Sequence, residues 1–282
     1  MLALGLGLSA SVAWGGSDLV AGLAGRRLPL LTVLIGAQAS GLALLIALLL
    51  VVGGRGPSAH AGLLAAGAGL AELAGYAALY KSLALGPMSV VAPISSIAAI
   101  VPVSVAVAGG QPIAAAAAVG IGLALIGAAA ACAERSNGER SGGPIVRGAV
   151  LAAVAALCFG AFFVAIDAAT KQSSPTWAVV IDRLASVTAL AVIAALTRPG
   201  LSIAGADLRA VSAVGVLDGA ANAMFAFALM HGLSSTVSVA GSLAPVTTVI
   251  LAALLLKERL ALLQTVGLMT VLAGVALFSG PV

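Results

Sequence analysis

Ten long apolar segments, separated by short loops, dominate this sequence and restrict what it can fold into. Each is close to the roughly 20 residues that an α-helix needs to cross a bilayer. With ends uncertain by about 2–4 residues, they span 3–23, 29–52, 60–80, 88–108, 112–133, 147–169, 175–197, 208–230, 235–256 and 260–280. Charged residues make up only 8% of the 282 residues, against about 25% in a soluble domain. The sequence therefore predicts an integral membrane protein without a sizeable soluble domain.

The apolar segments have the character of helices rather than barrel strands. They are unbroken, whereas the strands of a membrane barrel alternate between polar and apolar residues over about ten positions. The first segment lacks a basic leading region and is followed by further spans, which distinguishes it from a signal peptide. We expect an all-α membrane protein with ten transmembrane helices.

The second half of the chain resembles the first when it is shifted back by about 146 positions. Several polar and small residues then coincide: Ala39-Ser40 with Ala185-Ser186, Glu72 with Asp218, Tyr76 with Asn222, and Gly86 with Gly232. We expect two five-helix repeats, 1–133 and 147–282, joined by a cytoplasmic linker, 134–146, that is rich in Ser, Gly and charge. Two such halves often make a transporter whose site lies at their interface.

The basic residues predict the orientation of the chain, because cytoplasmic loops carry an excess of Lys and Arg. The loops are numbered in chain order, so that loop 1 follows the first span. The odd-numbered loops carry Arg26, Arg27, Lys81, Arg135, Arg140, Arg147, Arg198, Arg209, Lys257 and Arg259. The even-numbered loops carry only Arg55 and Lys171. This places the odd loops in the cytoplasm and both termini outside. With five spans in each half, the repeats are then inverted with respect to each other.

Charged residues inside a span are candidates for function, because each costs about 2.5–3.5 kcal/mol to insert at mid-membrane. Glu72 and Asp218 are the leading pair, since both lie near the centre of a span and are equivalent in the repeat. Tyr76 and Asn222 follow them four residues later, on the same helix face. These residues predict a substrate- or proton-binding site; the alternative is a hydrogen bond that only holds helices together.

Three further residues are candidates for lining the same site. Arg183 lies two turns into the span 175–197, where it either binds substrate or is neutralised by its neighbour Asp182, a residue that could also face Asp167 or Lys171. Asp18 and Trp14 share a helix face, so Asp18 either lines a cavity or pairs with Arg26 or Arg27.

Small residues and prolines predict how the spans pack and bend. Gly67, Ala71 and Gly75 recur every four residues and would allow close helix approach. Proline interrupts three positions inside spans, Pro93, Pro102 and Pro245, where we expect kinks beside a cavity.

Signals for enzymes are missing from the sequence. No His, Cys or carboxylate spacing is typical of a metal site, no Ser/His/Asp set stands out, and no nucleotide-binding loop follows a strand. The scattered charge of +4 does not suggest nucleic acid. We expect no catalysis, no cofactor and no metal. The expected partners are the lipid bilayer and a small-molecule substrate, with protons as a further ligand; nothing indicates an oligomeric state.

Several motifs together resemble the EamA-type ten-helix carriers of the drug/metabolite transporter superfamily over essentially the full length. They are Trp14-Gly15-Gly16-Ser17, Arg183, Ala244-Pro245, Lys257-Glu258-Arg259-Leu260, Gly267 and Gly274-Val275. The first repeat departs from the pattern with Gly110-Gln111-Pro112 in place of the charged signature, and Asp18 is not a hallmark of the family. The resemblance implies a secondary carrier of the inner or plasma membrane, without a cofactor, that moves small metabolites such as amino acids, often outward.

Two hypotheses follow from these residues. The first is a proton-coupled or facilitative exporter of a small polar metabolite, working by alternating access around a cavity lined from spans 3–23, 60–80, 147–169 and 208–230. The second is a non-transporting membrane subunit or a scaffold for a lipid-modifying enzyme. A continuous interface of apolar side chains, without a cavity at Glu72 or Asp218, would favour the second.

Overall fold

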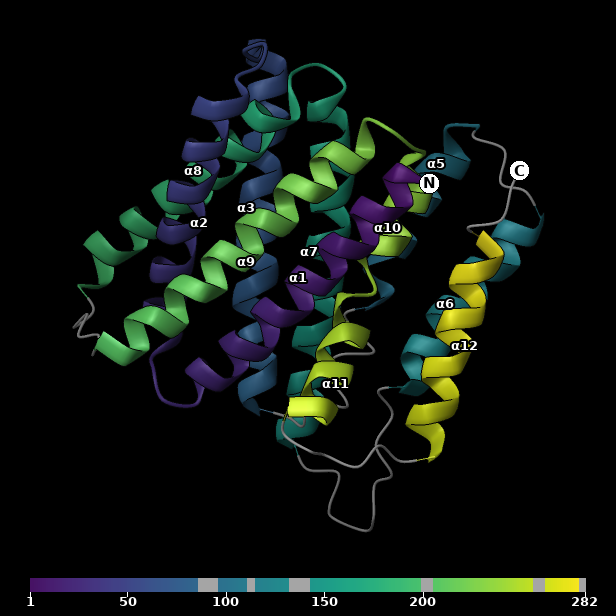
Figure 1. Ribbon diagram of the computed structural model, residues 1–282. Helices are drawn as coiled ribbons and strands as arrows, with labels where there is room; N and C mark the ends of the chain where they lie inside the picture. Colours follow the sequence, from purple (N-terminus) through teal and green to yellow (C-terminus); the bar gives the residue numbers. More distant parts are fainter. Residues whose placement is uncertain (86–95, 111–114, 132–142, 199–204, 256–261, 279–282) are drawn as a thin grey trace.

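A computed structural model describes residues 1–85, 96–110, 115–131, 143–198, 205–255 and 262–278, which form a bundle of helices (Figure 1). No strand occurs among these residues. The helices are α1 (Leu2–Gly25), α2 (Leu30–Val52), α3 (Ala59–Leu85), the 3-10 turn η1 (Ser96–Ala99), α5 (Ile100–Ala108), α6 (Ala115–Ala131), α7 (Gly143–Thr170), α8 (Pro175–Thr197), α9 (Gly205–Leu229), α10 (Ser234–Gly241), α11 (Ala244–Leu255) and α12 (Leu262–Phe278).

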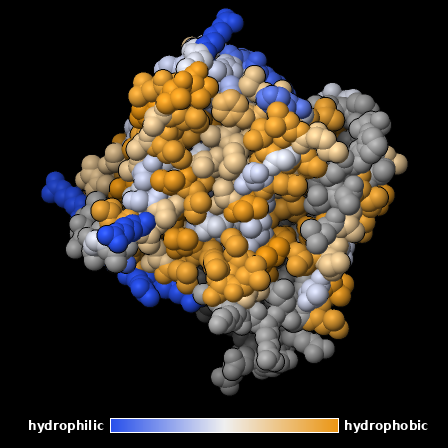
Figure 2. Space-filling model, in the orientation of Figure 1, coloured by the Kyte–Doolittle hydropathy of each residue, from blue (hydrophilic) through white to orange (hydrophobic). Residues whose placement is uncertain are grey.

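The outside of the bundle is apolar, as the scarcity of charge predicts. Large hydrophobic side chains on α2, α3 and α8 are largely exposed, among them Leu50, Leu63 and Leu196. Figure 2 shows apolar residues over most of one face, with hydrophilic residues at its edges. A surface of this kind is stable in lipid, where apolar side chains meet hydrocarbon and the helices satisfy their own backbone groups.

Six segments of the described chain are long and apolar enough to cross a membrane. They are Leu30–Val52, Ala59–Ser82, Val150–Thr170, Pro175–Thr197, Asp207–Leu229 and Ser234–Leu255. Each has a counterpart among the ten spans expected from the sequence. The all-α, multi-pass membrane character is therefore confirmed, while the number of ten spans stays a prediction.

Helices of the first half pack against helices of the second half. The main contacts join α1 to α9, α3 to α7, α2 to both α8 and α9, and α3 to α8. The helices α6 and α12 pack on each other at one side of the bundle (Figure 1). Because the halves interlock in this way, polar residues that are far apart in sequence meet in the interior.

Two glycines allow the closest helix crossings at the centre. A Cβ atom on Gly69 of α3 would overlap the carbonyl oxygen of Asp182 on α8, and one on Gly215 of α9 would overlap the carbonyl oxygen of Ala37 on α2. The expected close approach is found at Gly75, where a Cβ would lie 2.7 Å from the Phe159 ring of α7, but it is wrong at Gly67, where nothing lies within 4 Å of a Cβ. Gly69 points toward α8, whereas Gly67 lies on another face of the same helix.

The prolines and the linker depart in part from expectation. Pro93 and residues 134–142 of the linker lie outside the described residues, and α7 already begins at Gly143. Pro102 is the third residue of α5, directly after η1. Near Pro245 the span is interrupted rather than bent, since α10 ends at Gly241 and α11 begins at Ala244. A proline in the first turn of a helix loses no backbone hydrogen bond.

Candidate functional site

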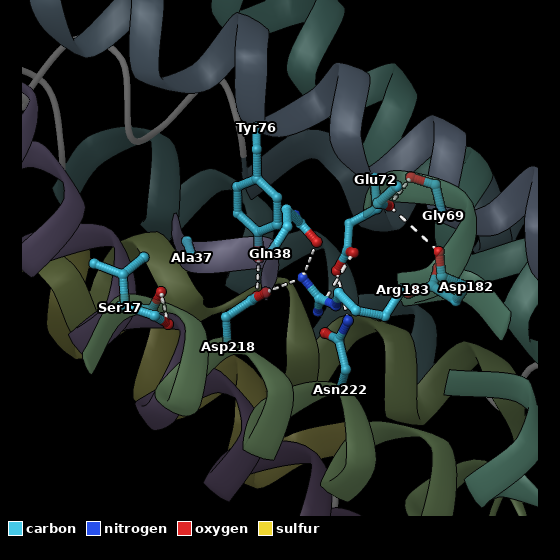
Figure 3. A network of polar contacts seen from close by, with 12 residues as sticks. Ser17, Ala37, Gln38, Gly69, Glu72, Tyr76, Asp182, Arg183, Asp218 and Asn222 are labelled. Carbon is cyan, nitrogen blue, oxygen red and sulfur yellow. Dashed lines mark hydrogen bonds and ion pairs between the residues drawn. The ribbon is translucent and has the colours of Figure 1, made fainter. Parts of the chain in front are cut away.

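Arg183 lies at the centre of the bundle, completely buried, between two carboxylates and an amide (Figure 3). Its Nη1 is 2.6 Å from Oδ2 of Asp218 on α9 and donates a hydrogen bond of 2.5 Å to Oε1 of Gln38 on α2. Its Nη2 is 3.6 Å from Oε2 of Glu72 on α3. A buried guanidinium needs such partners, because removing a charge from water costs several kcal/mol.

Hydrogen bonds extend from this ion pair across α1, α3 and α9. The Tyr76 hydroxyl donates to Oδ1 of Asp218. Asn222 donates through Nδ2 to Oε1 of Glu72 at 2.7 Å, and accepts a hydrogen bond of 2.9 Å from Nε1 of Trp14. A continuous polar network therefore links four helices through residues that the sequence singles out as site candidates.

The close crossings at Gly69 and Gly215 hold this network together. Ser186, one turn after Asp182 on α8, donates a hydrogen bond of 2.8 Å to the Gly69 carbonyl oxygen. That bond fixes α8 against α3, so that Arg183 lies opposite Glu72 (Figure 3). The crossing at Gly215 likewise brings α2, which carries Gln38, next to α9, which carries Asp218.

Acidic groups outnumber basic ones in this interior. Asp18, Glu72, Asp182 and Asp218 are all buried, and Arg183 is the one buried cation among the described residues. In the described part of the chain, neither carboxylate oxygen of Asp182 has a hydrogen-bond partner, and Oδ1 of Asp18 has none either. Several unpaired charges in a medium of low dielectric are costly. The arrangement is therefore balanced only when protons or a cationic ligand neutralise the excess of carboxylates.

A small cavity of about 50 Å³ adjoins the network and is lined mainly by aromatic rings. Its polar side chains are those of Asp18, Glu72, Tyr76 and Ser242, and the rings are those of Trp14, Tyr76, Phe159, Phe162 and Phe163. Further lining comes from Leu79, from Ala98 of η1, and from Gly241, Ala244 and Pro245 at the break between α10 and α11. The volume suffices for several water molecules or a small polar head group.

The cavity lining differs in part from the sequence prediction. The spans 3–23, 60–80 and 147–169 contribute as expected, but α9 supplies no residue among the described lining. Asp218 and Asn222 instead lie behind the wall, where Asp218 pairs with Arg183 and Asn222 joins Trp14 to Glu72. The break before Pro245 takes the place that we expected α9 to fill.

A second, larger hollow lies at the ends of α1 and α3. It has a volume of about 550 Å³ and is lined in part by Arg26, Tyr80 and Lys81. Tyr80 lies beside Tyr76, with the two rings tilted and their centroids 5.4 Å apart. Tyr80 lines this hollow, and Tyr76 lines the central cavity. The hollow lies at loops 1 and 3, which the charge pattern assigns to the cytoplasm.

The structure distinguishes between the alternatives that the sequence leaves open for the charged residues. Arg183 contacts Glu72 and Asp218 rather than being neutralised by Asp182. Lys171 pairs with Asp167 at 2.6 Å, on the surface and away from Asp182. Asp18 lines the cavity, and in the described residues it forms no ion pair with Arg26 or Arg27.

Two members of the network were not among the candidates. Gln38 is offset by one position from the repeat equivalent of Arg183, and this near-coincidence was the available signal. Ser186 coincides with Ser40 in the repeat, but a serine in a helix usually has only a local role. No group of three or more His, Cys, Asp or Glu side chains in the described residues is arranged to hold a metal ion.

Comparisons with known proteins concern the family and the fold of this chain. The model of the EamA-like transporter family matches residues 146–280. No curated protein matches the chain. A solved structure titled "Crystal structure of protein" has a TM-score of 0.78 and covers 98% of this chain and 95% of its own, at 19% identity. At this identity the similarity shows a shared fold. The resemblance noted in the sequence is confirmed for the second half of the chain: residues 146–280 match the EamA-like transporter family, part of the drug/metabolite transporter superfamily.

Proposed function

We propose that this membrane transporter is a secondary carrier that exports small polar metabolites, such as amino acids, by alternating access. The observation that carries the proposal is the buried network of Glu72, Arg183 and Asp218 beside a central cavity. A protein with a purely structural role has little use for several unpaired acids in its interior, because each one lowers its stability. The cavity at Glu72 also favours a transporter over a non-transporting subunit or a lipid-modifying scaffold.

Alternating access requires two halves that can move against each other, and the packing supports two inverted repeats. In the repeat, α1 is equivalent to α7, α2 to α8 and α3 to α9. The contact between α1 and α9 therefore corresponds to that between α7 and α3, and the contact between α2 and α9 to that between α8 and α3; all four contacts are present. Close approaches are also equivalent. A Cβ on Gly15 would lie 2.8 Å from the Ala244 carbonyl oxygen, and one on Gly160 would lie 2.8 Å from that of Ala98.

The larger hollow supports export as the proposed direction of transport. It adjoins Arg26 and Lys81 in loops that the charge pattern places in the cytoplasm. A substrate would enter there, pass Tyr80 and Tyr76, and reach the cavity at Glu72. The orientation proposed is therefore that of an exporter in the inner or plasma membrane, with odd loops inside and both termini outside.

Protons are a natural coupling ion for this site. Glu72 and Asp218 share Arg183 as their counter-ion, while Asp182 has no hydrogen-bond donor among the described residues. A proton taken up from one side and released on the other would change the charge around Arg183. Such a change would alter which helices the guanidinium holds together, as alternating access requires.

The test begins with cells that over-produce the protein and with mass spectrometry of the medium, which identifies the exported metabolite. Proteoliposomes are then loaded with that metabolite, and transport is compared for wild type, Glu72→Gln and Asp218→Asn. Asp167→Asn is the matched control, since Asp167 pairs with Lys171 at the surface. We expect both interior variants to lose most transport and the control to retain it. Folded interior variants that transport at the wild-type rate would remove Glu72 and Asp218 from the mechanism.

A further inference from the structure

Asp18 is a carboxylate that the polar network does not use. It is buried, it lines the central cavity, and its Oδ1 has no hydrogen-bond partner in the described part of the chain. Arg183 is engaged by Glu72, Asp218 and Gln38. A buried carboxylate that lines a cavity and has an unsatisfied oxygen is suited to a ligand that brings its own donor or positive charge.

Aromatic rings surround the space in front of Asp18. Trp14 lies one turn before Asp18 on α1, and its ring centroid is 6.4 Å from that of Phe162 and 6.0 Å from that of Phe163. The ring centroids of Tyr76 and Phe159, which also line the cavity, are 5.1 Å apart. All five rings line the cavity. The faces of such rings attract a cation, and Trp attracts it most strongly.

The charge of the cavity points the same way. Its lining includes two carboxyl groups, Asp18 and Glu72, and no Lys, Arg or His among the described lining residues. An anionic substrate group would meet carboxylates and ring faces, both of which repel it. A neutral donor could hydrogen-bond to Asp18, but it would leave the negative charge uncompensated. A positively charged nitrogen satisfies both the carboxylate and the rings.

We propose that the cavity is an ammonium-binding subsite, in which the Asp18 carboxylate and the rings of Trp14, Phe162 and Phe163 hold the cationic nitrogen of the substrate. This deepens and rests on the proposed transport function, because it assigns a charge to the part of the substrate that enters the cavity. The small volume restricts that part to an ammonium or a methyl-substituted ammonium group.

The chain allows a direct binding test, because it contains only two tryptophans. In Trp177→Phe protein the remaining tryptophan, Trp14, lies in the cavity wall and its fluorescence reports occupancy. The purified full chain in detergent is titrated with tetramethylammonium, with its neutral analogue tert-butanol and with acetate. We expect a saturable change with tetramethylammonium that is at least about tenfold weaker with tert-butanol, from the loss of the ion pair and the cation–π attraction. Acetate is expected to give no saturable change.

Two further variants locate the site, each made in the Trp177→Phe background. Asp18→Asn keeps the shape of the side chain and should weaken tetramethylammonium binding by at least about tenfold, whereas Asp167→Asn should leave it unchanged. Phe162→Leu removes one ring face and should weaken the cation more than the alcohol. If Asp18→Asn does not fold, the comparison of the three ligands on the Trp177→Phe protein still tests the proposal.

The proposal is overturned if tetramethylammonium gives no saturable signal, if tert-butanol binds equally well, or if acetate binds instead. Its failure is distinguishable from failure of the proposed function, since binding in detergent and transport in proteoliposomes are measured separately. Binding without transport would leave the subsite in place and remove the carrier. Transport of a metabolite without cation binding would leave the carrier in place and remove the subsite.

Discussion

Arg183 and Asp218 form a buried ion pair, with 2.6 Å between Nη1 and Oδ2, that joins α8 to α9 in the middle of the bundle. The guanidinium is completely buried and also faces Glu72 on α3. One cation therefore ties two carboxylates on different helices to a third helix.

Arg183→Ala is expected to destabilise the protein strongly. It leaves Asp218 and Glu72 buried without a counter-ion, and breaking a buried pair in this way costs about 3–5 kcal/mol. Thermal unfolding in detergent, followed by fluorescence, measures the effect. The control is Lys171→Ala, which breaks the surface pair with Asp167 and should change stability by no more than about 1 kcal/mol. Equal midpoints for the two variants would show that Arg183 does not stabilise the bundle.

Gly69→Ala is expected to lower stability by about 1–3 kcal/mol, because the new methyl group overlaps the Asp182 carbonyl oxygen and forces α3 away from α8. Gly67→Ala is the matched control on the same helix, since its Cβ meets nothing within 4 Å. There, alanine should be neutral or stabilising by up to about 1 kcal/mol. Unfolding midpoints of the two variants, compared side by side, check the prediction, and a loss at Gly67 as large as that at Gly69 would contradict it.

Tyr76→Phe removes the hydroxyl that donates to Asp218. We expect it to cost about 1–3 kcal/mol, since a hydrogen bond to a charged group is lost in the interior, and to slow transport of the identified metabolite in proteoliposomes. Tyr80→Phe is the control, because the Tyr80 hydroxyl makes no side-chain hydrogen bond in the described residues. Indistinguishable stability and transport for the two variants would mean that the Tyr76 hydroxyl does not contribute.

Cysteine labelling tests the orientation. Both native cysteines, Cys132 and Cys158, are first replaced by serine or alanine. Gly25→Cys and Gly56→Cys then place a single thiol in loops 1 and 2, at positions where a Cβ meets nothing within 4 Å. In intact cells an impermeant maleimide is expected to label position 56 and to miss position 25. The reverse pattern would invert the proposed topology and the direction of export.

The apolar segments and the intramembrane charges could be predicted from the sequence, because both depend on local composition. A span such as 175–197 is recognisable from its length and lack of charge, and it corresponds to α8 residue for residue. Glu72 and Asp218 stood out because charge inside a span is costly. Their equivalence in the repeat then indicated that the two carboxylates belong to one site.

The partners of these residues depended on how the helices cross. Nothing near position 183 in the sequence indicates that its guanidinium contacts Glu72, Asp218 and Gln38. Those contacts exist because Gly69 and Gly215 let backbones approach at two equivalent crossings. The cavity is likewise lined by residues at the break between helices α10 and α11, Gly241–Ala244, where the sequence predicts a kink.

The sequence by itself thus determined that the chain folds into apolar membrane helices and that a few charged groups lie within them. Only the tertiary structure decided that one arginine contacts two of the carboxylates and that Asp18 lines a cavity with aromatic rings in its wall. The physical reason is the separation along the chain over which each interaction acts. Hydrophobicity and helix formation act between neighbours along the chain, whereas an ion pair is set by the crossing of helices whose residues lie far apart in sequence.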